Sequence, residues 1–292
     1  MPKKITIVSA AALVLLLITV FVMLKVTSMK KLPDEEPPQS VSVLFPEKNE
    51  ILIVSYEEFL AGCVRGLLPS GAEPHPEAIR AVAIAEHSRA MYSLKNKKSV
   101  ENYGTDFAAG EDFPYDPDKT VPKEITAAVK ELPRLTYEGE PFNAQMCKIS
   151  AGKTDAAPPV SESIALLNDM NAKGYESSSA YTPEEVRRAM GFSKVSGNFG
   201  EWFSDPVYAD TGTLLFIDCC GTRLTGAELR RLLSLRSTAI YVEYREDKFY
   251  FTCKGWGENR GMSVNAAIFL ANSGSTAEEI LEVFYPNAEL SS

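Results

Sequence analysis

Two glutamates occupy positions where a carboxyl group could act as a general acid. Glu86 directly follows the nearly apolar stretch of residues 78–85, and Glu258 lies in the glycine-bearing loop of residues 255–261. A carboxyl group held away from water has a raised pKa, which suits it to donate a proton near neutral pH. The alternative for Glu86 is that it marks the turn where its helix reaches solvent and pairs with Arg89 at i, i+3. The alternative for Glu258 is an ordinary exposed loop acid.

Aromatic and thiol side chains supply further candidates. Trp256 stands between two glycines, which favours it over Trp202 as an aromatic surface for a ligand, and packing in the interior is the alternative for both. Five cysteines and two histidines are too few for a disulfide scaffold or a histidine-rich metal site. Cys147 lacks a second ligand at recognisable spacing, which favours a buried strand thiol over a metal ligand. Cys219 and Cys220 are expected at the end of a strand. The sequence as a whole predicts neither a bound metal nor a cofactor.

Short strands and helices must position these side chains. The β-branched runs 41–45 and 51–55 favour paired strands, and hairpins are expected within residues 134–147 and 238–254. Residues 96–120 are predicted to be a loop. Because strands and helices alternate without a regular βαβ period, the predicted class is α+β, a single mixed domain. Helices are predicted over residues 56–68, 76–94, 123–132, 226–233, 262–272 and 276–284, and a further helix starts at Thr182.

The N-terminal segment is hydrophobic enough to enter a membrane. Residues 5–24 carry no charged side chain, and 20 helical residues span about 30 Å, the thickness of the hydrocarbon layer. A cleaved signal peptide is the alternative, but its apolar region is usually shorter. We therefore expect a single-pass membrane anchor over residues 1–29, a linker rich in proline and acids over residues 30–39, and an extracytoplasmic domain over residues 40–292.

Composition excludes several classes of protein. The chain of 292 residues is 45% hydrophobic and 24% charged, which rules out a wholly disordered chain, a collagen and a multi-pass membrane protein. The formal net charge of −9 lacks the basic footprint of a nucleic-acid binder, so no nucleic-acid partner is expected.

Six segments occur in an order that carries a family resemblance. They are YEEFLAGCVRGLLPS (56–70), PEAIRAVAIAEHS (76–88), FNAQMCKISAGKT (142–154), GAELRRLLSLRST (226–238), GWGENRGMSVNAA (255–267) and STAEEILEVFYPNAEL (275–290). Together they resemble the stage II sporulation protein D family, which also includes amidase-enhancer proteins. The resemblance covers roughly residues 41–290.

The resemblance implies a single-pass membrane protein that acts on peptidoglycan during engulfment. The sporulation protein of that family is a lytic transglycosylase, which cleaves glycan strands alongside stage II sporulation proteins P and M. One carboxylic acid protonates the glycosidic oxygen, and its conjugate base then deprotonates the 6-hydroxyl to close an anhydro ring. The partners implied are peptidoglycan glycan strands, the membrane, and these engulfment proteins.

The active-site positions of that family are altered here. The family's catalytic Glu lies in a Glu-Met-Pro triplet after the first helix, and this chain has Leu67-Leu68-Pro69 in its place. Leu67 therefore occupies the position of the acid and cannot transfer a proton. Framework positions match the family, which predicts a divergent member. Other polar family positions are changed at Val82, His87, Ser88, Glu258 and Val264.

The retained loop positions define the expected glycan-binding cleft: Ser150, Gly152, Thr154, Trp256, Gly257, Gly261, Met262 and Ser263. Three functions remain open. The first is a peptidoglycan-binding or remodelling protein of sporulation with weak or no transglycosylase activity. The second is an active transglycosylase with a relocated acid, Glu258 or Glu86. The third is a non-enzymatic envelope scaffold or amidase activator.

Overall fold

A computed structural model describes residues 36–70, 74–96, 98–110, 113–157, 161–193 and 198–291 of the chain. The expected anchor, residues 1–29, lies outside these ranges. No helix within them is long and apolar enough to cross a membrane. From Pro38 onward the chain forms one compact unit. That unit is a mixture of short helices and strands, so the class is α+β as predicted.

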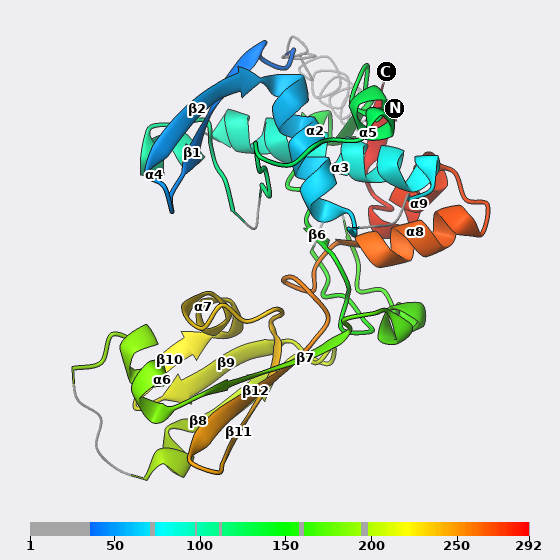
Figure 1. Cartoon of the computed structure of the whole chain (residues 1–292). Helices are drawn as coiled ribbons and strands as arrows, with labels where there is room; N and C mark the ends of the chain where they lie inside the picture. The colour runs from blue at the N-terminus through cyan, green and yellow to red at the C-terminus, as the bar shows by residue number, and fades with distance from the viewer. Residues whose placement is uncertain are drawn as a thin grey trace, which may run out of the picture. The chain divides into compact units, whose positions relative to one another are not determined.

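Two helices form the centre of the first of two hydrophobic cores. Helix α2 (Tyr56–Leu67) begins at Ser55, whose hydroxyl accepts the N–H of Glu58 at 3.1 Å. Helix α3 (Pro76–Asn96) is buried along most of residues 78–90, because its alanines allow neighbouring helices to approach closely. Figure 1 shows α3 with α2, α8 and α9 around it.

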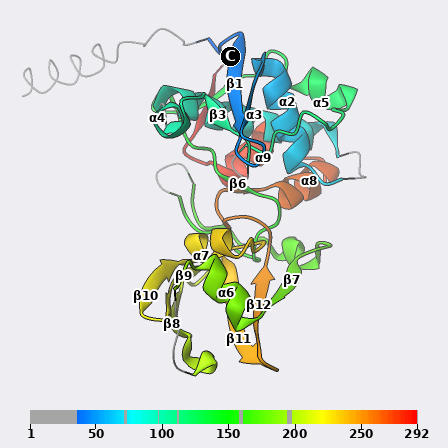
Figure 2. The ribbon, with the colours of Figure 1, turned by 60° about the vertical axis from the view of Figure 1, so that its left-hand side comes forward.

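The other elements of the first core surround these helices (Figure 2). A three-stranded sheet has the order β2-β1-β3, and a second has the order β14-β4-β5. Residues of β1, α5, α8 and α9 contribute to the same core as α2 and α3. The elements are β1 (Ser40–Phe45), β2 (Glu50–Ser55), α4 (Lys98–Tyr103), β3 (Phe107–Ala108), α5 (Lys123–Ala128), β4 (Arg134–Tyr137), β5 (Glu140–Pro141), α8 (Val264–Asn272), α9 (Ala277–Phe284) and β14 (Glu289–Ser291).

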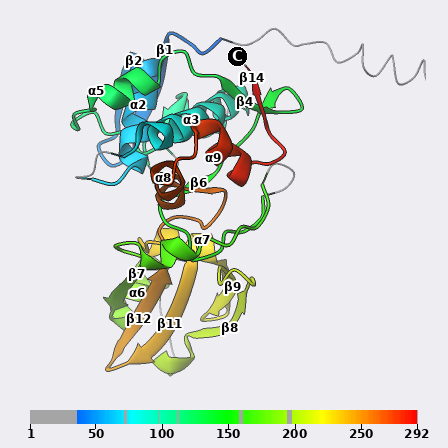
Figure 3. The ribbon, with the colours of Figure 1, turned by 90° about the vertical axis from the view of Figure 1, so that its right-hand side faces the viewer.

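The second core is formed by two three-stranded sheets and two helices (Figure 3). One sheet has the order β11-β12-β7 and the other β10-β9-β8. Trp202, Leu229, Phe249 and Phe251 are among the side chains buried in this core. The elements are β7 (Glu176–Tyr181), α6 (Pro183–Ala189), β8 (Phe203–Tyr208), β9 (Leu214–Cys219), β10 (Thr222–Thr225), α7 (Gly226–Leu232), β11 (Ala239–Arg245) and β12 (Lys248–Lys254).

The chain leaves the first core and returns to it on adjacent strands. Strand β6 (Met146–Cys147) pairs in parallel with β13 (Met262–Ser263). The hairpin expected within residues 134–147 is therefore shorter than predicted: β4 pairs with β5, and β6 has β13 as its partner.

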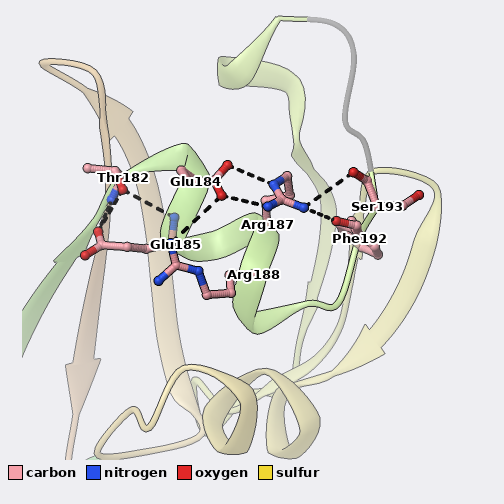
Figure 4. A network of polar contacts seen from close by, with 7 residues as sticks. All are labelled: Thr182, Glu184, Glu185, Arg187, Arg188, Phe192 and Ser193. Atoms are coloured by element: carbon pink, nitrogen blue, oxygen red, sulfur yellow. Dashed lines mark hydrogen bonds and ion pairs between the residues drawn. The ribbon is translucent and has the colours of Figure 1, made fainter.

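Helix capping follows the sequence signals closely. Thr182 and Thr225 each form a capping box with the Glu three residues later. In α6 the Arg187 guanidinium donates to both carboxylate oxygens of Glu184, at 2.8 and 2.7 Å, and also to the carbonyl of Phe192 (Figure 4). These contacts fix both ends of a two-turn helix that would be marginal by itself.

Some expectations were wrong. Residues 96–120 were predicted to be a loop, but they contain α4 and β3. Strands β7 and β8 had no predicted counterpart. The strands over residues 41–55 and the hairpin over residues 238–254 are confirmed, and the turn of that hairpin has positive φ at Glu246 and Asp247.

Candidate functional site

A pocket of about 340 Å³ lies in the described part of the chain, beside the end of α2. Its walls come from α2, α3, α7, the segment around β6 and the loop of residues 255–261. This volume is at the lower end of the range for small-molecule sites. The lining residues are Leu67, Arg89, Gly110, Pro114, Asn143, Gln145, Met146, Cys147, Lys148, Arg230, Trp256, Gly257, Glu258 and Arg260.

Glycines allow the loop of residues 255–261 to lie against the β6 segment. Gly257 has φ of +121°, and a Cβ there would be 2.9 Å from the Cβ of Cys147. Gly261 has φ of +64°, and a Cβ there would overlap the carbonyl group of Gln145. Both positions combine a left-handed backbone with close contact, which only glycine satisfies without strain. The loop sequence thus places Trp256 and Glu258 at the pocket wall.

A buried carboxylate holds the wall of the pocket together. Asp169, on the 3₁₀ helix Leu167–Asn171, is fully buried. It accepts the N–H of Ser150 at 2.8 Å, the hydroxyl of Ser263 at 2.6 Å and the amide of Asn265 at 2.8 Å. Ser263 in turn caps α8 by accepting the N–H of Ala266. One carboxylate therefore joins three segments that are distant in the sequence.

A second buried polar side chain anchors the same loop. Asn259 has φ of 60° and is 1% exposed. Its Oδ1 accepts the N–H of Ala151 at 2.8 Å, and its Nδ2 donates to the carbonyl of Lys153 at 2.9 Å and to the hydroxyl of Thr213 at 3.0 Å. An asparagine tolerates the left-handed conformation better than most residues. Its hydrogen bonds replace those that a regular strand would supply.

The residues expected to form the cleft divide into two groups. Trp256 and Gly257 line the pocket. The other six are buried and do not line it: Ser150, Gly152, Thr154, Gly261, Met262 and Ser263. Among these, Ser150 and Ser263 both donate hydrogen bonds to the buried carboxylate of Asp169.

The two candidate acids, Glu86 and Glu258, differ in their exposure and in whether they line the pocket. Leu67 is 5% exposed and lines the pocket, and the exposed Glu258 lines the same pocket. Glu86 is 0% exposed and does not line it. The expectation that Glu86 marks the turn where α3 reaches solvent is wrong, but its pairing with Arg89 at i, i+3 is confirmed, with Nε and Oε2 3.6 Å apart. Of the two acids, only Glu258 is placed to contact a ligand in this pocket.

The two tryptophans have different surroundings. Trp202 is buried and stacks on Phe249 with ring centroids 5.4 Å apart, which is a packing role. Trp256 is 38% exposed. The Arg236 guanidinium lies 4.4 Å and the Lys148 ammonium 4.8 Å from its ring centroid. Trp256 thus combines exposed aromatic surface with neighbouring cations.

The thiols are free throughout the described chain. Cys147 is buried on β6, and burial, followed by the nearby Asp169 and Asp155, raises the pKa of its thiol. A thiol kept protonated in this way is a poor metal ligand. No group of three or more His, Cys, Asp or Glu side chains among the described residues is placed to hold a metal. Cys219 ends β9 and exposed Cys220 follows it, as expected for strand-end residues.

We predict that native protein at pH 7 reacts with iodoacetamide first at Cys220, because it is the exposed thiol of the five. Cys147 should react at least about tenfold more slowly, since it is both buried and protonated. Peptide mass spectrometry after timed labelling measures the two rates. In urea the five rates should converge, and equal labelling of Cys147 and Cys220 in the native protein would contradict the buried environment.

Sequence reasoning missed three residues that shape the site. Asp169 lies in a segment with no predicted element, although an acid inside the apolar context of Leu166 and Met170 is a detectable signal. Arg89 and Arg230 were assigned no role at the pocket, because their helices are distant in sequence and only the fold brings them together.

Comparison with known proteins identifies two relatives that carry the same name. No family model matches the chain. It is 24% identical over 289 residues to stage II sporulation protein D of Bacillus subtilis (strain 168), covering 87% of this chain and 79% of the relative. It is 23% identical over 290 residues to stage II sporulation protein D of Bacillus amyloliquefaciens, covering 88% of this chain and 80% of that relative. These two matches, each over more than four fifths of this chain, support a divergent relative of stage II sporulation protein D.

Proposed function

We propose that this protein acts in sporulation, in remodelling the cell wall during engulfment, by binding peptidoglycan glycan strands with weak or no lytic transglycosylase activity. The relationship to stage II sporulation protein D supports the sporulation role. The observation that supports weak or no transglycosylase activity is the leucine at position 67. It lines the pocket at the position where the family's acid is expected, and it offers no proton.

The pocket suits a saccharide in two respects. The partly exposed ring of Trp256 provides a surface on which a sugar can stack. Asn143 and Gln145 also line the pocket and supply amide or backbone groups for hydrogen bonds to hydroxyls. The proposed location is the cell membrane, with residues 5–24 as anchor and the domain outside the cytoplasm.

Retention on immobilised, peptide-stripped glycan strands tests this proposal, with the full-length protein in detergent. We expect the wild type to be retained, and Trp256→Ala to weaken binding about tenfold, as truncation of an aromatic contact typically does. Phe269→Ala is the matched control, because Phe269 is a 52% exposed aromatic that does not line the pocket. Absence of wild-type retention at low salt would refute glycan binding.

An active transglycosylase is the second candidate, and one observation favours it. Glu258 lines the same pocket as Leu67 and carries a carboxyl group. Mass spectrometry of digested strands distinguishes the two candidates: anhydro-muramic products that disappear in Glu258→Gln would establish the enzyme. Our proposal expects no such products.

A scaffold or amidase activator without affinity for glycan is the remaining alternative. Partners for such a role would be other engulfment proteins, such as stage II sporulation proteins P and M. A partner that remains crosslinked after the peptidoglycan has been digested, from protein that glycan strands do not retain, would favour this alternative.

A further inference from the structure

The described lining of the pocket is strongly cationic. Arg89, Lys148, Arg230 and Arg260 line it, and Glu258 is the one acid among its described lining residues. The whole chain has a formal net charge of −9, so this concentration of positive charge runs against the overall composition. Electrostatic attraction in such a concave site favours an anionic ligand.

Arg89 is held in place from behind the wall. Glu86 is fully buried, and its Oε2 lies 3.6 Å from Nε of Arg89. The guanidinium carbon of Arg89 is 5.0 Å from the ring centroid of Phe113. Only Arg89 of the Glu86–Arg89 pair lines the pocket. Contacts with a carboxylate and an aromatic ring fix the orientation of the planar group and reduce the entropy that binding would cost.

Arg230 and Lys148 extend the cationic surface. Arg230, on α7, is 6% exposed and lines the pocket from the second core. Burial, followed by repulsion from Lys119 and Arg65, lowers the pKa of Lys148. Charges at a partly buried wall are less screened by water than surface charges, so they act more strongly on a bound group.

We infer that this pocket is a carboxylate-binding subsite, in which Arg89, Arg230 and the exposed Arg260 bind the acid group of a sugar and Glu86 is a positioning residue for Arg89. Arginine's fork of N–H donors matches the two oxygens of a carboxylate. The inference rests on the proposed function and names the chemistry of the ligand: muramic acid carries a lactyl carboxylate wherever its peptide has been removed. A phosphate group of an envelope polymer is the other source of an oxyanion.

Small probes test the subsite separately from strand binding. The full-length protein in detergent is titrated calorimetrically with N-acetylmuramic acid, N-acetylglucosamine and glycerol phosphate. We expect N-acetylmuramic acid to bind at least about tenfold more tightly than N-acetylglucosamine, the ratio that one charge-assisted contact provides. Equal affinity for the two sugars would overturn the inference. If glycerol phosphate bound more tightly than N-acetylmuramic acid, the assignment of the site to a carboxylate would be overturned.

Substitutions in the pocket test which side chains select N-acetylmuramic acid over N-acetylglucosamine. Arg260→Gln, at an exposed position, and the double variant Glu86→Gln with Arg89→Met should both lower the ratio of the two sugar affinities. The double variant leaves no unpaired buried charge, so it should fold. Glu86→Gln alone should also lower the ratio, whereas a merely structural defect would weaken both sugars equally. Arg188→Gln, with a 74% exposed side chain on α6, is the charge-matched control and should change nothing.

The outcomes for polymer and probe are distinguishable. Strands retained equally well after their carboxyl groups are converted to amides would overturn the subsite and leave glycan binding standing. Selective binding of N-acetylmuramic acid by a protein that strands do not retain would support the subsite and refute the proposed function. An unchanged ratio in both the Arg260 variant and the double variant would show that the selected group binds elsewhere.

Discussion

Replacing Asp169 with alanine is expected to lower the free energy of unfolding by about 3–5 kcal/mol. The substitution removes the shared acceptor of Ser150, Ser263 and Asn265, and each buried donor left without a partner costs about 1–3 kcal/mol. Urea denaturation followed by circular dichroism measures the change. The loss should be accompanied by weaker glycan retention, because the same carboxylate holds the pocket wall.

Asp210→Ala provides the matched control for Asp169. Its side chain is 92% exposed and its ion pair with Lys153 is a surface contact. Removal of such a solvent-exposed contact is expected to change stability little. If Asp169→Ala were no more destabilising than Asp210→Ala, the three hydrogen bonds would not be holding the segments together.

Acid should destabilise the protein through His87. The ring is buried and lies 2.9 Å from the hydroxyl of Tyr56. Burial first, and then the positive charge of Arg134, lower the pKa of His87 to about 4. Between about pH 6.5 and pH 4 the unfolded chain binds a proton that the native protein does not. Stability therefore rises with pH across this window, and about 2 kcal/mol is lost on going from pH 7 to pH 4.5.

The comparison of wild type with His87→Gln isolates this contribution from the carboxyl groups that titrate in the same range. The variant should show a curve of unfolding free energy against pH that is flatter by about 2 kcal/mol over that interval. His75→Gln is the control, because His75 is the other histidine and is exposed. Parallel curves for wild type and His87→Gln would show that the ring is accessible to protons in the folded protein.

Local signals predicted the parts of the fold that are determined locally. Thr182 and Thr225 begin their helices as expected, because a capping box needs only residues within one turn. Strand β7 was missed because its sequence, ESSSAY, has little apolar character and depends on pairing with β12. Strand β8 contains Pro206 and has a register irregularity between Ser204 and Val207, which its place at a sheet edge allows.

The site was predictable only where the chain itself supplies the spacing. The glycines of residues 255–261 predicted a loop with Trp256 and Glu258 in it, and both line the pocket. The burial of Ser150 and Ser263 was not predictable, because it depends on Asp169 from a segment without a recognisable pattern. The cationic wall was missed for a similar reason, since Arg89 and Arg230 come from different cores.

The parallel pairing of β6 with β13 has a consequence for synthesis on the ribosome. The intervening residues 148–261 behave as an insertion whose two ends meet on neighbouring strands, about 5 Å apart. Helices α8 and α9, which pack on α3, emerge only after this insertion has been made. The apolar faces of α2 and α3 therefore meet their last partners only after residues 264–284 have been translated and have left the exit tunnel. The second core can fold before the first, although its residues are translated later than α2 and α3.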